Sequence, residues 1–355
     1  MPAGRRAPTA AGPGPAISPP RRRPPTMQDV ARALGVSTMT VSRALRDGTA
    51  VNTETREAVL RAADALGYVF DSTAANLRRQ RTGFVAVIIP SINNANFADT
   101  VRALSGELEA RQLQPLLGAT DYDFRREEGL VEQMLRRRPE AIVVTGGRHT
   151  ARCRGLLQGA HIPVVEMWDS PAAPIGHVVG FSNARSAAIV VDHLVAQGYR
   201  RIAFLGGDAA GDARGVQRRE GFVAAMRRHG LAPDRLVATG TPPVSMRSGA
   251  LAIRDLLARF PDTEAVACVS DLAAFGALSE CQRRGIAVPG AMAIAGFGNF
   301  EIAESCVPAL TTVDPAPQQI GRHAAAIVSR ALAGGAGHER IFVEPTLIVR
   351  QSTGG

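Results

Sequence analysis

The sequence contains no lysine, and it is poor in cysteine and tryptophan. All forty-one basic residues are arginine, a uniformity that can reflect coding bias as well as binding chemistry. The four cysteines (Cys153, Cys268, Cys281 and Cys306) are far apart and form no CxxC pair, which argues against a zinc ribbon or a disulfide framework. No apolar run approaches the roughly 18 residues that a membrane span needs. We therefore expect a soluble, cytoplasmic protein that contacts no membrane.

Composition and charge divide the chain into two parts. With 355 residues, 45% of them hydrophobic, the chain can bury real cores, and at roughly 100 to 200 residues per domain it allows two or three domains. Residues 1–82 hold thirteen arginines and six acidic residues, a net charge of +7 out of +9 for the whole chain. A basic front end on a nearly neutral body indicates a polyanionic partner for the front end alone.

The first seventy residues divide into a tail and three helices. Residues 1–25 are rich in proline and glycine and lack an apolar period, which predicts a disordered tail. Helix-capping residues, and glycines that can end a helix in the left-handed backbone conformation, then predict helices over 27–34, 38–45 and 53–66. The predicted core of these helices is Val30, Ala31, Leu34, Val36, Val41, Leu45, Val59, Leu60 and Leu66.

From Phe84 onward, short apolar runs alternate with amphipathic stretches. The runs cover 84–90, 113–120, 141–146, 163–168, 177–182, 201–207, 236–240, 265–270 and 292–298. Helical stretches are predicted over 97–111, 124–138, 185–198, 216–230, 247–259 and 271–285. Near-continuous apolar strands separated by helices predict an α/β fold with parallel sheets covered on both faces. Because the series restarts near Arg201, we expect two doubly wound lobes.

The stretch MQDVARALGVSTMTVSRAL has the spacing of a helix-turn-helix. Such a motif needs a small residue where two helices cross, a glycine at the turn and a branched apolar residue on the second helix, here Ala31, Gly35 and Val41. The alternative is a three-helix surface with ordinary polar residues, which the spacing and local charge disfavour. The second helix would present to a major groove Ser37, Thr38, Met39, Thr40, Ser42 and Arg43. Hydroxyls can contact phosphates or bases, Met39 a thymine methyl, and Arg43 a guanine.

The run from Thr26 through TVSRAL and TREAVLRAADALGY, followed by an α/β body, resembles the lactose-repressor (LacI) family of bacterial transcription regulators. The resemblance extends from Thr26 to near the carboxyl end and implies a DNA-binding domain over 26–70. It implies that Thr38, Met39 and Arg43 read bases. It further implies contacts to the DNA backbone from Thr26, Ser37, Thr40, Asn52 and Tyr68.

The same resemblance implies a hinge helix in the linker 71–82. In this family, the segment that corresponds to DSTAANLRR orders on operator DNA and inserts a leucine into the minor groove; here that leucine is Leu77, which follows Asn76. Nine residues are too few for a stable isolated helix, so the order has to come from DNA and from the partner's hinge. The alternative is that Leu77 is a linker residue against the body.

Two doubly wound lobes create a cleft at the strand ends, the usual site of a small ligand. The resemblance implies one effector-binding and dimerisation domain over 83–355, with lobe 1 at 83–181 plus 315–342 and lobe 2 at 182–314 plus 343–352. Candidate effector-binding residues at the ends of the predicted strands are Asn96, Phe97, Thr145, Glu166, Trp168, Asp169, Asn183, Arg218, Ser270, Asp271 and Asn299. Any one of them can instead be a helix cap or a surface charge. The family commonly has an effector-binding arginine at the position of Arg218, which suits a carboxylate.

Within the family, PSINNANFA, IPVVEMWDSP, VGFSN and ECQRRGIAVPGAMAIAGF resemble the gluconate-repressor branch. This implies a small-molecule effector, such as gluconate or a related sugar acid, and no cofactor. It also implies a homodimer on double-stranded palindromic operator DNA that represses genes of carbohydrate or sugar-acid utilisation. Either the ligand-free or the ligand-bound protein could be the form that binds DNA, and both alternatives stay open.

Two other classes of protein compete with a regulator. The seven histidines show no metal-ligand spacing, and the sequence has no Walker loop, GxSxG elbow or proper GxGxxG loop, so we expect no catalytic residue, no metal and no enzyme. A solute-binding protein of the sugar-transport type would share the body. It would need a secretion signal and would not need residues 26–80. The front end therefore favours the regulator.

Overall fold

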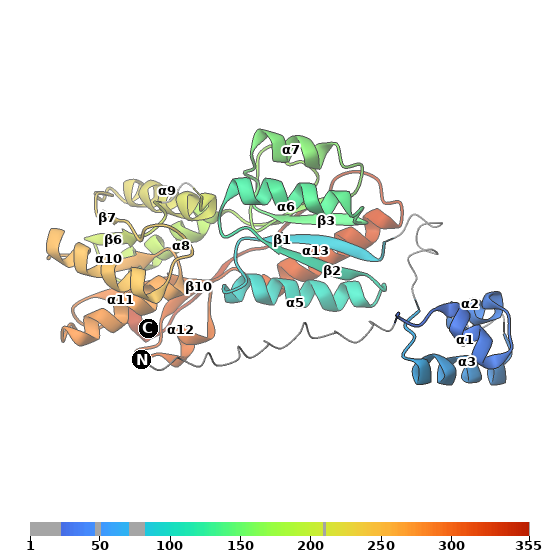
Figure 1. Ribbon diagram of the computed structural model, residues 1–355. Helices are drawn as coiled ribbons and strands as arrows, with labels where there is room; N and C mark the ends of the chain where they lie inside the picture. The colour runs from blue at the N-terminus through green and yellow to red at the C-terminus, as the bar shows by residue number, and fades with distance from the viewer. Residues whose placement is uncertain (1–22, 47–50, 71–81, 209–210, 355) are drawn as a thin grey trace, which may run out of the picture. The chain divides into compact units, whose positions relative to one another are not determined.

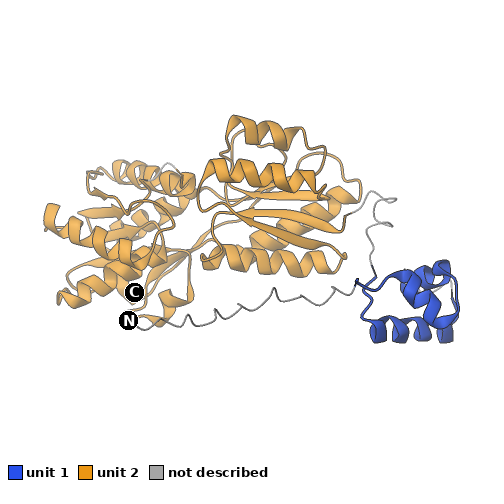
Figure 2. Ribbon diagram, in the orientation of Figure 1, with its two compact units in different colours: residues 1–79 blue, residues 80–355 orange. Residues whose placement is uncertain are grey.

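The structure is a computed structural model, and it describes residues 23–46, 51–70, 82–208 and 211–354. The chain forms two compact units, residues 1–79 and residues 80–355 (Figure 2). Most of the predicted disordered tail lies outside the described residues. The predicted hinge helix, with Asn76 and Leu77, lies outside them as well.

The described residues of unit 1 form three helices around one small core: α1 (Met27–Leu34), α2 (Thr38–Arg46) and α3 (Thr53–Leu66). The core contains Val30, Ala31, Val41, Ala44, Val59 and Ala63. The prediction was wrong for Leu60 and Leu66, which are 38% and 41% exposed. Leu60 is rotated by about 100° from the buried Val59 on the helix, and Leu66 is the last residue of α3.

Unit 2 contains two parallel-sheet lobes, as predicted (Figure 1). In lobe 1 the strand order is β11-β5-β4-β3-β1-β2. Its elements are β1 (Phe84–Ile89), α5 (Ala95–Glu109), β2 (Gln114–Ala119), α6 (Phe124–Arg136), β3 (Ala141–Thr145), α7 (Ala151–Gln158), β4 (Val164–Met167), β5 (His177–Gly180), α13 (Pro317–Leu332) and β11 (Arg340–Phe342). Helices α7 and α13 are absent from the predicted set.

In lobe 2 the order is β12-β10-β9-β8-β6-β7, and only β12 runs antiparallel, against β10. Its elements are α8 (Asn183–Ala196), β6 (Ile202–Leu205), α9 (Ala213–Arg228), β7 (Leu236–Val237), α10 (Met246–Arg259), β8 (Ala265–Cys268), α11 (Asp271–Arg283), β9 (Ala293–Phe297), α12 (Glu301–Ser305), β10 (Thr311–Asp314), β12 (Thr346–Ile348) and the 3-10 helix η1 (Gln351–Thr353). The chain therefore passes between the lobes after β5, after β10 and after β11. These passages bring the carboxyl ends of both sheets to one interface.

Strand β1 shows how the sheet of lobe 1 is covered. Its side chains alternate: Val85, Val87 and Ile89 belong to the core on the side of α5 and α13, and Ala86 and Ile88 belong to the core under α6 and α7. Because both faces are buried, the strand is apolar throughout, which is the pattern that predicted a parallel sheet. Among the described residues, no helix combines the length and the apolar character that crossing a bilayer requires.

Candidate functional site

In unit 1, α1 and α2 are joined by a tight turn at Gly35. The backbone of Gly35 is left-handed (φ 65°), and the next residue, Val36, donates its N–H to the carbonyl of Ala31 at 3.1 Å. Ala31 and Val41 are buried where the two helices meet. The three residues that carried the helix-turn-helix prediction therefore have the packing that the motif requires.

The amino-terminal part of α2 presents the predicted base-reading residues to solvent. Thr38 and Arg43 are exposed. Met39 has a large apolar side chain that is 61% exposed and is not part of the core of unit 1. Ser42, also predicted to face DNA, is half-buried. The exposed ridge has the hydroxyl, thioether and guanidinium groups that major-groove recognition uses.

Several residues predicted to contact the DNA backbone also cap helices. Ser37 Oγ accepts the Thr40 N–H at 3.0 Å, and Asn52 Oδ1 accepts the Thr55 N–H at 2.8 Å. Thr26 donates both its N–H and its hydroxyl to Asp29, and Tyr68 packs against the edge of the core. These bonds explain the residue types structurally, and the DNA contacts stay predictions.

In unit 2, a cavity of about 460 Å³, here called the cleft cavity, opens between the lobes. Five of the predicted effector-binding residues line it: Asn96, Phe97, Trp168, Arg218 and Ser270. The cavity is also lined by Ser91, Asn93, Asn94, Tyr122, Asp212, Arg214, Pro242, Pro243, Val244, Ser245, Met246, Arg247, Val269, Leu272, Phe297 and Phe300. Its position at the strand ends is the one predicted from the doubly wound topology.

Trp168 forms the aromatic wall of the cleft cavity. Its backbone is left-handed (φ 72°), which turns the chain at the end of β4, and its ring meets the edges of Phe97 and Phe181 at centroid distances of 5.2 and 5.9 Å. Its indole Nε1 is buried and has no hydrogen-bond partner among the described residues. A buried indole N–H ordinarily finds an acceptor, so a ligand oxygen fits there.

Arg218 supplies a fixed positive charge. Its guanidinium lies over the Phe297 ring, 4.3 Å from the centroid, and its Nη1 donates to Asn183 Oδ1 at 2.6 Å. Its Nε is buried and has no partner within the described chain. Burial lowers the pKa of Arg218, while the nearby Asp212 acts in the opposite direction. An anionic ligand would offset this burial and occupy the open donor.

Asn183, Thr145 and Asp169 do not line the cavity; Asn183 and Thr145 bond to groups that do, and Asp169 bonds across the lobes. Asn183 Nδ2 donates to the carbonyl of Trp168 at 3.1 Å, so this one amide contacts both Trp168 and Arg218. The carbonyl oxygen of Thr145 accepts a hydrogen bond from Arg214 Nη1 at 3.4 Å. Asp169 Oδ2 accepts from Gln217 Nε2 at 3.3 Å, a contact between the lobes.

The other three predicted effector-binding residues have other surroundings. Glu166 is fully buried in β4. Asp271 is also buried, where it accepts the Phe300 N–H at 2.8 Å and the Thr312 hydroxyl at 2.6 Å. Asn299 lies outside the cleft cavity and bonds to Asp314 and Arg350. Each side chain supports the fold, which is why a position at a strand end did not bring it to the cavity.

Sequence reasoning missed Tyr122, Asp212 and Arg214. Tyr122 follows the end of β2, a signal that was available. Asp212 and Arg214 follow the end of β6, so the same signal applied to them. Burial and the carboxylate of Asp212 raise the pKa of Tyr122. Arg214 lies over the Phe97 ring of the other lobe at 5.6 Å.

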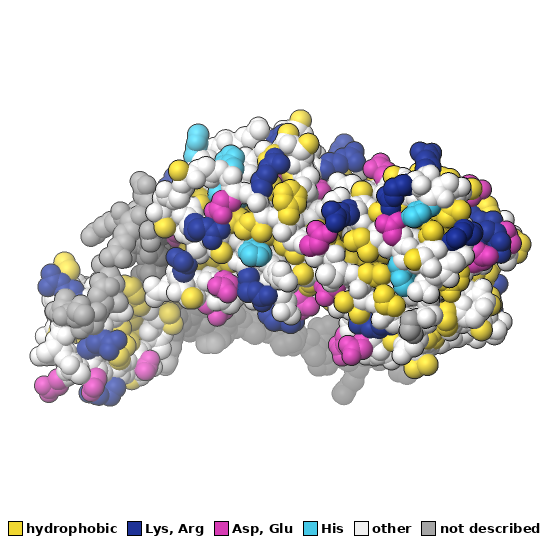
Figure 3. All heavy atoms as spheres, turned by 180° about the vertical axis from the view of Figure 1, so that it is seen from behind, with side chains coloured by type: hydrophobic (Ala, Val, Ile, Leu, Met, Phe, Trp, Pro, Cys, Tyr) yellow, Lys and Arg dark blue, Asp and Glu magenta, His cyan; other side chains and the backbone are white. Residues whose placement is uncertain are grey.

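The surface of unit 2 fits its small net charge. On the face seen in Figure 3, arginine and acidic side chains are intermingled. Many of them form ion pairs, such as Arg235 with Asp262 at 2.7 Å. Intermingled and paired charges are what a nearly neutral body requires.

Comparison with known proteins agrees with both halves of this description. Residues 26–71 match "Bacterial regulatory proteins, lacI family", and residues 191–353 match "Periplasmic binding protein-like domain". The HTH-type transcriptional regulator GntR of Pseudomonas aeruginosa is 34% identical over 310 residues, covering 87% of this chain and 90% of that protein. The chain belongs to the LacI family.

Solved structures of LacI-family regulators have the same fold. One from Silicibacter pomeroyi is 36% identical with a TM-score of 0.86, covering 93% of this chain and 99% of the other. A second from the same organism is 46% identical with a TM-score of 0.73, covering 76% and 98%. This LacI-family chain is accordingly a DNA-binding transcriptional regulator, with unit 1 as the DNA-binding domain and a binding-protein-like body.

Proposed function

We propose that this regulator is a cytoplasmic homodimeric repressor of carbohydrate or sugar-acid utilisation genes. It binds a palindromic operator, and a sugar acid of the gluconate class in the cleft cavity controls that binding. The observation that carries the ligand class is the buried, unpartnered Nε of Arg218 at the cavity wall.

The charge of the cleft cavity favours an anion. Three arginines line it (Arg214, Arg218 and Arg247), against one carboxylate, that of Asp212. A carboxylate ligand can accept two parallel hydrogen bonds from a guanidinium, and its hydroxyls can accept from Trp168 Nε1 and bond to Asn94 and Asn96. A neutral sugar would satisfy the hydroxyl partners but leave the arginine charge without a counter-ion.

Control of DNA binding follows from where the ligand lies. A molecule in the cleft cavity touches both lobes and so favours one relative arrangement of them. In a homodimer, this arrangement would set whether the two copies of α2 can enter successive major grooves, about 34 Å apart, at the same time. Such coupling requires different ligand affinities in the two states.

A thermal-unfolding screen tests the ligand class. Glucose lacks the carboxylate of gluconate but closes into a ring in water, so glucitol, an open six-carbon polyol without a carboxylate, is the matched control and glucose a second neutral one. Ligand at 100 times its Kd adds about 2.7 kcal/mol to the free energy of unfolding. We expect gluconate or a related sugar acid to raise Tm and both neutral compounds to leave it unchanged; an equal shift by glucitol would contradict an anion site.

The DNA partner is tested with a sequence selected from random duplexes by the purified protein. The selected sequence should have two-fold symmetry. The protein should shift that duplex specifically in a gel, and the shifted fraction should change when the sugar acid is added. A protein that bound the sugar acid but selected no DNA sequence would contradict the proposed control of operator binding.

A further inference from the structure

A second group of functional side chains lies in lobe 1, outside the cleft cavity. Glu127 of α6, His149 before α7, Cys153 of α7 and Glu166 of β4 come together there, and are called the α6–α7 cluster. The side chains of His149 and Glu166 are fully buried, as is Cys153, and that of Glu127 is 6% exposed. The effector site and the DNA-binding unit use none of these residues.

Three atoms of the cluster are spaced as ligands of one small cation. Glu127 Oε2 lies 3.1 Å from His149 Nδ1 and 3.9 Å from Cys153 Sγ, and all three atoms lie within 4.8 Å of one another. In a tetrahedral zinc site, bond lengths of about 2.0 to 2.3 Å separate neighbouring ligand atoms by about 3.3 to 3.6 Å. The two distances from Glu127 Oε2 are within a few tenths of an ångström of that spacing.

The opposite edge of the imidazole is unsatisfied. His149 Nε2 and Glu166 Oε1 are both buried, lie 3.7 Å apart, and have no hydrogen-bond partner among the described residues. The other oxygen of Glu166 accepts the Ile175 N–H at 2.5 Å, which fixes the carboxylate toward His149. A histidine that binds a metal through one nitrogen commonly donates its other N–H to a carboxylate, and Glu166 is in that position.

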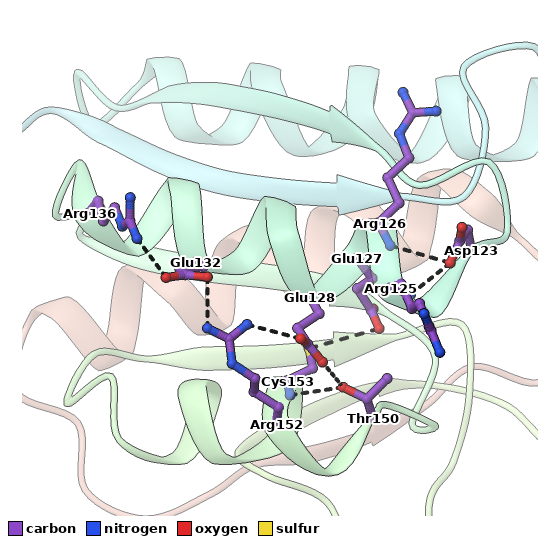
Figure 4. Close-up of polar contacts among 10 residues, drawn as sticks. All are labelled: Asp123, Arg125, Arg126, Glu127, Glu128, Glu132, Arg136, Thr150, Arg152 and Cys153. Atoms are coloured by element: carbon purple, nitrogen blue, oxygen red, sulfur yellow. Dashed lines mark hydrogen bonds and ion pairs between the residues drawn. The ribbon is translucent and has the colours of Figure 1, made fainter.

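Contacts between α6 and α7 fix the two helices that carry Glu127 and Cys153 (Figure 4). Thr150 donates its hydroxyl to Glu128 at 2.6 Å and accepts the Cys153 N–H at 3.0 Å, which fixes the first turn of α7. Arg152 bonds to both Glu128 and Glu132 at 2.9 Å. The site is therefore preorganised before any cation binds.

The charges of the cluster also favour a divalent cation. Two buried carboxylates, those of Glu127 and Glu166, face one imidazole. Zinc binds cysteine as a thiolate, so binding would release the Cys153 proton. The two positive charges of Zn²⁺ would then offset most of the three negative charges of the two carboxylates and the thiolate.

We propose that Glu127, His149 and Cys153 bind a zinc ion, with Glu166 as a positioning residue that accepts the Nε2–H of His149. A water molecule or the second oxygen of Glu127 completes the tetrahedron. The ion ties α6 to α7 and stabilises lobe 1. This inference does not depend on the proposed operator or effector.

The test uses the full-length protein, stripped with a chelator and then given Zn²⁺ or Co²⁺ alone. We expect one equivalent of zinc per chain after dialysis, a higher Tm, and a thiolate-to-cobalt charge-transfer band with Co²⁺. The Cys153→Ser and His149→Gln variants should lose the band and the equivalent of zinc. Glu166→Gln should weaken binding by about 10- to 100-fold. Cys306→Ser, which changes a half-buried thiol of lobe 2, is the matched control and should bind as the parent chain does.

Two results would overturn the proposal. One is a parent chain that takes up no stoichiometric zinc and shows no Tm shift. The other is a stoichiometric site that survives in both Cys153→Ser and His149→Gln. If a variant fails to fold, as judged by circular dichroism, the cobalt spectrum of the parent chain decides: a thiolate band supports the site, and cobalt spectra without one contradict it.

Discussion

Arg218 lies with its guanidinium carbon 4.3 Å from the centre of the Phe297 ring. The two residues come from α9 and β9 of the same lobe, so the stacked pair is fixed by the fold of lobe 2. The contact with the ring and the bond to Asn183 restrict the guanidinium of Arg218, which lines the cavity. The charge is therefore positioned before a ligand arrives, which lowers the entropic cost of binding.

Replacing Arg218 should abolish the ligand response while operator binding is kept. Arg218→Ala removes a charged hydrogen-bond donor worth about 1.5 to 3 kcal/mol, so we expect the sugar-acid affinity to fall by at least 10-fold in calorimetry. Arg218→Lys keeps the charge but loses the planar fork and should recover only part of the affinity. A normal response in Arg218→Ala would remove this residue from the ligand site.

Trp168 makes the protein its own reporter of ligand binding. It is the single tryptophan of the chain, and it lines the cleft cavity with its indole N–H unpartnered. A ligand that accepts this N–H changes the polarity around the ring, so the intrinsic emission should change along a titration with the Kd found by calorimetry. Trp168→Phe should abolish the signal. An unchanged emission spectrum at saturating ligand would contradict direct contact.

Arg43→Ala should weaken operator discrimination without changing the cleft. An arginine forked onto guanine contributes about 1 to 3 kcal/mol of selectivity against the wrong base, so the ratio of affinities for the selected operator and a single-base variant should fall. Gel shifts on the two duplexes measure this ratio. Sugar-acid affinity, measured on the same preparation, should stay at the parent value; equal losses of both would argue against separate sites.

Asp271 should make stability depend on pH. Burial raises its pKa from 3.8 to about 6, while bonds from Thr312 and Phe300 act in the opposite direction. The folded state then binds the proton more tightly than the unfolded state. The contribution to stability is full below pH 3.8 and is lost as pH rises through 6, a change of roughly 3 kcal/mol.

Urea unfolding of the parent chain and of Asp271→Asn between pH 4 and pH 7.5 isolates this effect. Asparagine keeps an oxygen for the Phe300 N–H and does not ionise, and the other titrating groups are shared. The unfolding free energy of the parent chain minus that of the variant should therefore fall as pH rises. Parallel curves would show that Asp271 ionises normally in the fold.

The helix-turn-helix was predictable because its signals are local. Ala31, Gly35 and Val41 act within one stretch of sequence, and a glycine turn or a capping bond forms between near neighbours in any context. The doubly wound lobes were predictable for a similar reason: strands buried on both faces have to be apolar throughout. Sequence alone thus determined the two architectures and the edge of the sheets where the cleft cavity lies.

Which side chains reach the cavity was decided only by tertiary structure. Asp271 and Trp168 both lie at the end of a strand, yet Asp271 turns inward to Phe300 and Thr312, and the left-handed backbone of Trp168 turns its ring to the cleft. The α6–α7 cluster has the same origin. Glu127, His149 and Glu166 follow no metal-ligand spacing in the sequence, and they meet because α6, the loop before α7 and β4 pack together in lobe 1. Long-range packing leaves no periodic trace, so only the folded chain reveals such groups.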